Sequence, residues 1–306
     1  MIRIQNEHLE KYLKEHIDGV QQYIKYEVFS EAEAKYIKEN IEYILGAKPH
    51  ELKEVIRDKT ILAIDTDILK KAFVGGNYKG GSYGYTKFIK KDETIKNERY
   101  DAYRLAEKLQ VNVCPYCNIN STFTVIEEDN KKITRPEFDH FYDKATYPIL
   151  ALSFYNLIPS CHICNSTLKG SEEFSIESHL NPYSDSFNEV AKFKLKIEKS
   201  TFYHSIKGFN LTLESENIRA NKNIESFKLE TLYQNHKDII LELIQKQAIY
   251  NESYLDELLT QYEGTLFKNR EDLQRLISGG YVSDDEIGKR PLSKLIKDIS
   301  EELGLR

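Results

Sequence analysis

The sequence predicts an α+β protein that is mainly helical and carries a small central module held together by zinc. Three observations predict this class. Apolar residues recur at helical spacing towards both ends of the chain. Between them, residues 122–126 and 133–141 are β-prone. All the cysteines of the chain fall in two Cys-x-x-Cys pairs, Cys114/Cys117 and Cys161/Cys164.

Length and composition indicate a globular chain with more than one module. The chain has 306 residues, of which 40% are hydrophobic and 30% charged, so it can bury a core. The predicted domains are a helical N-terminal region over 1–105, a module with structural zinc over 106–175, and a mainly helical C-terminal region with one β-hairpin over 176–306.

The N-terminal region is predicted to be helical. Over residues 5–45 apolar side chains repeat at helical intervals, as at Leu9 and Ile17, until Gly46 and Pro49 end the run. The elements predicted next are a helix over 50–58, a helix or strand over 60–73, a glycine-rich loop over 75–85 and a helix over 92–109. The glycine-rich loop could drape over a nucleic acid, but we interpret it as a surface loop or hinge.

The central module is predicted to contain a hairpin followed by a helix. Its first strand is 122–126, its turn is 127–132, and its second strand, 133–141, ends at Asp139 and His140. The elements predicted after it are an irregular connection over 144–159, a helix over 160–174, a hairpin of 192–198 with 209–214, long helices over 222–275 and a final helix over 291–303.

Charge and hydropathy exclude several classes of protein. No stretch approaches the roughly 20 apolar residues that span a bilayer, and the first residues lack the apolar core of a secretory signal. We therefore expect a cytoplasmic protein with no membrane partner, and there paired cysteines are more often metal ligands than disulfides. The net charge of −6 argues against a protein that coats nucleic acid by charge alone. It does not exclude a nuclease that grips a few phosphates.

The cysteine pairs predict a structural zinc site. Zinc takes four thiolates in a tetrahedron, and each Cys-x-x-Cys pair supplies two of them. Cys114, Cys117, Cys161 and Cys164 would fill all four positions, so the ion would hold shape without doing chemistry. The alternative is four unrelated core cysteines, which requires two clean pairs to arise with no stray cysteine.

Asp139 and His140 form the second candidate site. Neighbouring residues of a strand face opposite sides, so both groups reach one pocket only where the backbone bends. There the carboxylate could hold a divalent cation while the imidazole activates a water. Taken alone, an Asp-His dipeptide is more often a pair of surface residues.

Polar residues around the second cysteine pair complete the candidates. Asn156 suits a turn or a cap, and Asn165 suits a helix cap or an amide ligand to a metal. Lys169, one helical turn after Asn165, could face the same site and contact a phosphate. His162 could also reach a metal, although a solvated side chain is the simpler interpretation.

Taken in order, Cys-x-x-Cys, Asp-His, Asn-Leu-x-Pro-x-Cys-x-x-Cys-Asn and Lys resemble the HNH endonuclease family, in the subset whose ββα-metal finger is held by a four-cysteine zinc. The resemblance implies that His140 is the general base and that Asn156 braces the loop between strand and helix. It also implies that Asp139 and Asn165 ligate a catalytic divalent cation. Mg²⁺ or Mn²⁺ suits these ligands better than a softer metal.

A finer resemblance is to the Septu PtuB-like group of anti-phage HNH nucleases. It rests on Asp-His-Phe-Tyr-x-Lys over 139–144, Leu-Asn-Pro over 180–182 and a stretch over 220–233. It implies DNA as the substrate, Lys144 and Lys169 as substrate-binding residues, and an ABC-type ATPase as a partner.

Two other functions stay open at this point. One is a non-catalytic zinc module that docks onto a protein or nucleic acid, which would keep the cysteines but have no use for Asp139 and His140. The other is an RNA-cleaving HNH toxin, because the same site can attack either backbone. Residues 1–105 resemble no family that we recognise, and the sequence leaves the oligomeric state open.

Overall fold

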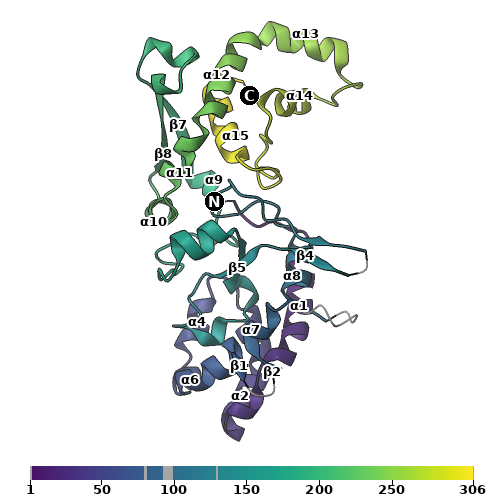
Figure 1. Cartoon of the computed structure of the whole chain (residues 1–306), viewed down its shortest axis with the longest axis vertical. Coiled ribbons are helices and arrows are strands. Elements are labelled where there is room, and N and C mark those ends of the chain that lie inside the picture. Colours follow the sequence, from purple (N-terminus) through teal and green to yellow (C-terminus); the bar gives the residue numbers. More distant parts are fainter. Residues whose placement is uncertain (1, 79–80, 92–98, 129, 306) are drawn as a thin grey trace. The chain divides into compact units, whose positions relative to one another are not determined.

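The computed structural model describes residues 2–78, 81–91, 99–128 and 130–305 (Figure 1). Contacts between residues divide the chain into two compact units. Unit 1 comprises Met1–Arg3, Asn112–Ser121 and Ser186–Arg306, and unit 2 comprises Ile4–Val111 and Thr122–Asp185. This grouping differs from the three sequence domains, because the N-terminal region and most of the central module fall in one unit.

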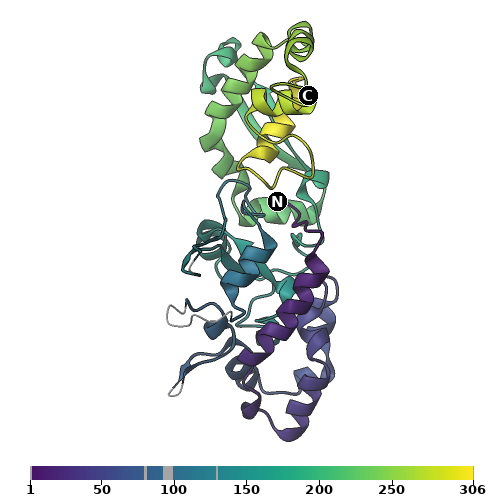
Figure 2. The ribbon, with the colours of Figure 1, turned by 90° about the vertical axis from the view of Figure 1, so that its right-hand side faces the viewer.

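The N-terminal part of unit 2 is helical, as predicted. Its helical elements are α1 (Leu9–Val20), η1 (Gln21–Tyr23), η2 (Tyr26–Val28), α2 (Glu31–Glu39), α3 (Ile41–Gly46), α4 (Leu52–Arg57), α5 (Lys59–Leu62), α6 (Thr66–Leu69), η3 (Lys70–Val74), α7 (Gly84–Phe88) and α8 (Ala102–Leu109). Ser30 begins α2 with a capping box, in which Ser30 and Glu33 satisfy each other's backbone N–H groups. Helix α1, purple in Figure 2, packs against α3 and α8.

Two glycines shape the segment that was predicted as a loop over 75–85. The segment contains a short antiparallel pair, β1 (Asn77–Tyr78) and β2 (Gly81–Ser82), and the start of α7, so it is not loop throughout. Gly75 and Gly84 both have positive φ, and a Cβ atom on either would meet backbone atoms at 1.9 Å and 2.5 Å. Only glycine permits this approach of α7 to η3.

Three of the predicted stretches fall partly beyond the described residues. Residues 79–80 belong to the glycine-rich segment, residues 92–98 belong to the helix predicted over 92–109, and residue 129 belongs to the turn predicted over 127–132. Within the second stretch, the described helix is α8, which Asp101 caps by accepting from the N–H groups of Tyr103 and Arg104.

The central strands pair differently from the single predicted hairpin. The strands are β3 (Val125–Ile126), β4 (Lys132–Thr134), β5 (Glu137–His140) and β6 (Leu157–Ser160). β3 pairs with β4, whereas β5 pairs with β6, so the predicted strand over 133–141 is two strands. Pro136 lies at the break, and it lacks the N–H group that a continuous ladder needs. The end of the connection predicted as irregular over 144–159 is therefore strand.

A helix follows β6 directly and completes a strand–strand–helix unit. This helix, η6 (Ile163–Lys169), has π-type hydrogen bonding and is shorter than the helix predicted over 160–174. It ends at Gly170, which has a positive φ of 50°. In β5–β6, His140 lies opposite Leu157 and Glu137 lies opposite Ser160. Glu137, the first residue of β5, is thereby brought close to the start of the helix.

Unit 1 contains the second predicted hairpin and the C-terminal helices. Its elements are α9 (Phe187–Val190), β7 (Ala191–Ile197), β8 (Phe209–Ser215), α10 (Ile218–Ser226), α11 (Leu229–Tyr233), α12 (Lys237–Ile249), α13 (Glu252–Tyr262), α14 (Arg270–Ser278) and α15 (Ser293–Glu302), with short 3₁₀ turns η7 (Ser200–Tyr203), η8 (Ile206–Gly208) and η9 (Gln234–His236). The strands pair antiparallel along their whole length. The helices predicted over 222–275 are shorter than expected, and one of the breaks lies at Lys228, which adopts a left-handed conformation between α10 and α11.

Helix α15 contains a buried ion pair whose two side chains also bond to the backbone of β7. Lys294 and Asp298, one turn apart, contact each other with their side chains almost fully buried. The carboxylate of Asp298 also accepts from the N–H of Phe193 at 2.9 Å. The whole arrangement is mixed, mainly helical with small two-stranded sheets, which agrees with the predicted α+β class. Among the described residues, none of the helices is both long and apolar enough to cross a bilayer.

Candidate active site

A cavity of about 450 Å³ lies in unit 2 where β5, η6 and α7 meet. It brings together five of the residues predicted from the sequence, Asp139, His140, Lys144, Asn165 and Lys169. The other residues that line it are Tyr85, Thr86, Ile89, Arg135, Glu137, Phe138, Asp143, Ser166, Gly170 and Glu172. Asn156 and the four cysteines do not line it.

His140 is a buried, neutral imidazole with a defined tautomer. Its Nε2 lies 2.9 Å from the carbonyl oxygen of Ala151. A carbonyl only accepts, so Nε2 carries the proton and Nδ1 keeps the lone pair. Burial lowers the pKa of His140 well below its usual value, and the charge of Lys144 lowers it further, although the bond to Ala151 opposes this. The ring is therefore unprotonated near neutral pH.

The ring of His140 rests on an aromatic residue from the N-terminal region. Tyr85 meets it edge to face, with ring centroids 4.4 Å apart. The hydroxyl of Tyr85 donates to the carbonyl of Phe138 at 3.1 Å, and this bond ties α7 to β5. Residues 1–105 therefore supply one wall of the cavity, which no sequence signal indicated.

The carboxylate of Asp139 is held by Lys169. The Nζ atom of Lys169 lies 2.8 Å from each carboxylate oxygen, and both side chains are almost fully buried. The same amino group donates to the carbonyls of His140 and Phe141, and it lies 4.7 Å from the ring centroid of Phe174. Lys169 thus neutralises Asp139 and fixes the end of β5.

Glu137 is the centre of a hydrogen-bond cluster that sequence reasoning missed. Its carboxylate accepts from Asn165 Nδ2 at 2.8 Å and from the Ser166 hydroxyl at 2.9 Å, and it lies 2.7 Å from Nδ1 of His162. Burial alone would raise the pKa of Glu137, but these hydrogen bonds outweigh burial and lower it. The bond to Glu137 raises the pKa of His162.

Strand alternation is the signal that could have identified Glu137. Residues i and i+2 of a strand lie on one face, so Glu137 and Asp139 project to the same side of β5. Asn165 on η6 donates its amide nitrogen to Glu137, which leaves its amide oxygen as the group available to a ligand.

Asn156 is fully buried and joins the two ends of the loop between β5 and β6. Its side-chain oxygen accepts from the N–H of Tyr142 at 2.7 Å. Its amide nitrogen donates to the carbonyls of Tyr142 and Leu150 at 3.0 Å and 3.1 Å. These contacts hold the turn that carries Ala151, whose carbonyl in turn sets the tautomer of His140.

The four cysteines form a buried cluster. Their Sγ atoms all lie within 4.8 Å of one another. Zinc–sulfur bonds of about 2.3 Å in a tetrahedron place sulfur atoms about 3.8 Å apart, so the cluster can hold a zinc ion. Backbone N–H groups reach two of the sulfurs at 3.4 Å, Ile119 to Cys117 and Cys164 to Cys161. The predicted convergence of the thiols is confirmed.

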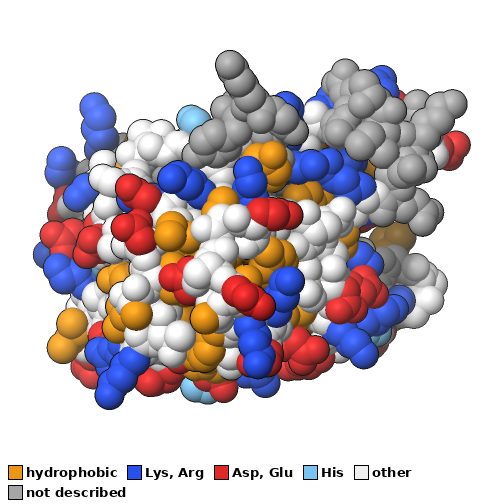
Figure 3. All heavy atoms as spheres, turned by 90° about the horizontal axis from the view of Figure 1, so that it is seen from below, with side chains coloured by type: hydrophobic (Ala, Val, Ile, Leu, Met, Phe, Trp, Pro, Cys, Tyr) orange, Lys and Arg blue, Asp and Glu red, His pale blue; other side chains and the backbone are white. Residues whose placement is uncertain are grey.

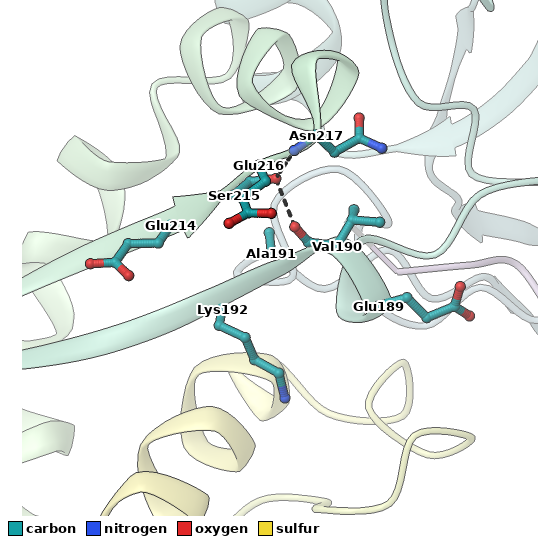
Figure 4. Close-up of a pocket in the computed structure, with 8 residues that line it drawn as sticks. All are labelled: Glu189, Val190, Ala191, Lys192, Glu214, Ser215, Glu216 and Asn217. Carbon is teal, nitrogen blue, oxygen red and sulfur yellow. Dashed lines mark hydrogen bonds between the residues drawn. The ribbon is translucent and has the colours of Figure 1, made fainter.

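A second pocket, in unit 1, has a different character (Figure 4). It lies at the end of the β7–β8 hairpin, where the Ser215 hydroxyl donates to the Val190 carbonyl and accepts from the N–H of Asn217. The side chains of Glu189 and Glu214 point apart, and Lys192 points towards α15, where it pairs with Glu301. These contacts hold together the open end of the β7–β8 hairpin, and they bring no reactive groups together.

One curated protein is similar to this chain. The chain is 27% identical over 145 residues to the Septu protein PtuB of Bacillus thuringiensis. The match covers 47% of this chain and 47% of that relative, so the chain spans about half the length of the curated relative. No family model matches the chain, and no solved structure matches it. Membership of the HNH family therefore stays a proposal.

Proposed function

We propose that this chain is a metal-dependent endonuclease of the HNH type that hydrolyses DNA phosphodiester bonds in anti-phage defence. One observation carries the proposal. Asp139, His140 and Asn165 line one cavity, and His140 is held neutral with its Nδ1 lone pair available. The similarity to the Septu protein PtuB supports the defence setting.

In this proposal, His140 takes the proton from the attacking water at Nδ1. Because burial keeps the imidazole unprotonated, the base is in its reactive form near neutral pH without prior deprotonation. The Ala151 carbonyl holds the ring through Nε2–H and stabilises the positive charge that develops when Nδ1 gains a proton. Tyr85 limits rotation of the ring.

The oxygen donors around the cavity suit a hard divalent cation such as Mg²⁺ or Mn²⁺. Asp139 and Asn165 would hold it, with Glu137 on the same strand face as Asp139. Such a cation, when bound, neutralises charge that develops on the phosphate and the leaving oxygen. Because Lys169 occupies both oxygens of Asp139, the cation has to displace this amino group or share the carboxylate with it.

The Asp139–Lys169 pair also favours a second candidate, the non-catalytic zinc module. A carboxylate already neutralised by a buried lysine needs no metal. In that case the cysteine cluster would keep its structural zinc, and no reaction would take place in the cavity. The neutral state of His140 fits both candidates, so cleavage has to be measured directly.

Cleavage of supercoiled plasmid by the purified, zinc-loaded chain tests the proposal. We expect Mg²⁺ or Mn²⁺ to stimulate cutting, and we expect His140→Ala and Asp139→Asn to lower the rate by about 10²-fold or more, the range for loss of a general base. His8→Ala removes an exposed histidine and is the matched control. Wild-type cutting by His140→Ala would remove His140 from the base role.

The same assay separates the alternatives. Cutting of RNA but not DNA under these conditions would support the RNA-cleaving toxin. Absence of cutting for every substrate, with zinc still bound, would support the docking module.

We also propose an ABC-type ATPase as partner. The resemblance to the Septu PtuB-like group supports it, and so does the net charge of −6, since an acidic chain attracts DNA poorly by itself. Co-purification with an ATPase encoded beside this gene, and faster cutting in its presence, would be the expected result.

A further inference from the structure

The cavity contains two kinds of cation, and only one kind is neutralised. Lys169 pairs with Asp139 and has little charge left to offer a ligand. Arg135 and Lys144 line the same cavity. Among the residues that the structure describes, neither forms an ion pair with a carboxylate, and both are only half-buried.

Backbone carbonyls and aromatic rings hold the guanidinium of Arg135 in place. Its two terminal nitrogens donate to the carbonyls of Pro136 and Ile89, at 2.6 Å and 3.1 Å. The guanidinium lies 5.4 Å from the ring centroid of Tyr103 and 5.8 Å from that of Phe138. Carbonyls and ring faces orient a cation but do not cancel its charge. A guanidinium has five N–H donors, so hydrogens stay available on a fixed fork.

Lys144 approaches the cavity from the opposite end of β5. Its amino group lies 5.7 Å from the ring centroid of Tyr85, the residue that supports His140. It is close enough for its charge to lower the pKa of His140. Tyr85 thus neighbours both Lys144 and the imidazole of the proposed base.

We propose that Arg135 and Lys144 form a phosphate-binding subsite that holds the nucleic-acid strand beside His140. This inference rests on the proposed function, and it places Arg135 beside Lys144 in the role that the sequence analysis expects of Lys144 and Lys169. An oriented guanidinium suits bidentate contact with phosphate oxygens. A flexible lysine suits a point contact with a neighbouring phosphate.

Salt dependence of binding tests the subsite separately from catalysis. Each phosphate contact contributes about 0.9 to the slope of log K against log salt for duplex DNA. Fluorescence anisotropy with a labelled duplex, in buffer without added divalent cation and with the structural zinc retained, measures this slope. We expect Arg135→Gln and Lys144→Gln each to make the slope shallower by about one.

Matched variants separate a phosphate contact from a structural role. Arg135→Lys keeps the charge and is expected to keep the slope. Lys131→Gln removes a lysine that is exposed and paired with Glu127 on the neighbouring hairpin, so its slope should equal that of the wild type. Lys144 forms no hydrogen bond within the part of the chain that the structure describes, so Lys144→Gln gives a result even if Arg135→Gln does not fold.

The outcomes test the phosphate-binding subsite and the nuclease proposal separately. An unchanged slope in Lys144→Gln and in folded Arg135→Gln, or an equal change in Lys131→Gln, overturns the subsite. A shallower slope without any DNA cutting keeps the subsite and removes the nuclease proposal. If the wild type cuts DNA but the salt slope is the same in the Arg135 and Lys144 variants, the nuclease proposal is kept and the subsite is removed.

Discussion

His140 shows how burial can both limit and enable a side chain. Removal of the ring from water lowers its pKa, which weakens it as a base but keeps it unprotonated. One carbonyl, that of Ala151, decides which nitrogen carries the proton. Asn156 holds the turn that presents this carbonyl, so it affects the ring of His140 through position alone.

Lys169 offers the sharpest test at the scale of a residue. Lys169→Met keeps the length of the side chain but removes the amino group that neutralises the buried carboxylate of Asp139. Loss of one member of a buried pair costs about 3–5 kcal/mol of the free energy of unfolding. Urea unfolding measures this loss. Mg²⁺ should then stabilise Lys169→Met more than the wild type, because Lys169 no longer competes with a cation for the carboxylate of Asp139.

An exposed pair is the control for this measurement. Lys35 and Glu39, one turn apart on α2, are 75% and 61% exposed. Lys35→Met should change the free energy of unfolding by about 0.5 kcal/mol or less. No Mg²⁺-dependent gain in Lys169→Met would exclude Asp139 as a cation ligand.

At the scale of elements, the sequence predicts best what depends on short spacing. The cysteine pairs and the Asp-His dipeptide are local patterns. From them we could expect the four thiols to meet in one cluster, and Asp139 and His140 to line one cavity. The pairing of β5 with β6 could not be expected, because a fully buried strand of four residues, Leu-Ile-Pro-Ser over 157–160, has no alternation to reveal it. The proline at 136 was the available warning that the strand over 133–141 would divide.

Long-range contacts account for the residues that sequence reasoning missed. Tyr85 is more than fifty positions from His140, and it reaches the site only because two glycines let α7 approach η3. Glu137 gains its partners from η6, a helix whose position depends on the pairing of β5 with β6. The contact of Tyr85 leaves no pattern in the local sequence, and strand alternation places Glu137 on the face of Asp139 without revealing its partners on η6.

The cysteine cluster yields a prediction about zinc content and thermal stability. Cys161→Ser should lower the zinc content from about one ion per chain and lower the melting temperature, because a buried hydroxyl is a poor ligand for zinc. Metal analysis by mass spectrometry and a thermal melt measure both effects.

Cys114→Ser is the matched variant, since one ion held by four thiols should be lost equally from either pair. Full zinc content in both variants, with unchanged melting, would contradict a shared structural zinc.

For the whole molecule, acidic side chains slightly outnumber basic ones, with 49 Asp and Glu against 43 Lys and Arg. On the face shown in Figure 3, Lys and Arg side chains are interspersed with Asp and Glu side chains. This agrees with the net charge of −6 and with weak electrostatic steering of DNA. Specific positions such as Arg135 and Lys144 then matter more than bulk charge.

The stability of the fold should depend on acid through His16. This residue is fully buried, and burial lowers its pKa to about 4, although the bond from its Nε2 to the Leu152 carbonyl opposes the shift. Between pH of about 6.5 and about 4, the unfolded chain binds a proton that the folded chain does not. Stability therefore falls as the pH drops through this window, by about 1.4 kcal/mol per pH unit.

Urea unfolding at several pH values measures this dependence. His16→Gln keeps a donor for Leu152 but cannot be protonated, so its free energy of unfolding should vary less than that of the wild type across the window. His8→Gln, at an exposed position, should match the wild type. Equal pH profiles for His16→Gln and the wild type would contradict the assignment.

The contact between Tyr85 and His140 has a consequence for anyone who would transplant this centre. A fragment that starts at residue 106 carries every recognisable signature yet lacks the phenol against which the imidazole leans. Such a fragment would keep the predicted site residues but lose the aromatic contact that supports the ring of His140. Any excised module therefore has to extend well before residue 106, so that it includes Tyr85.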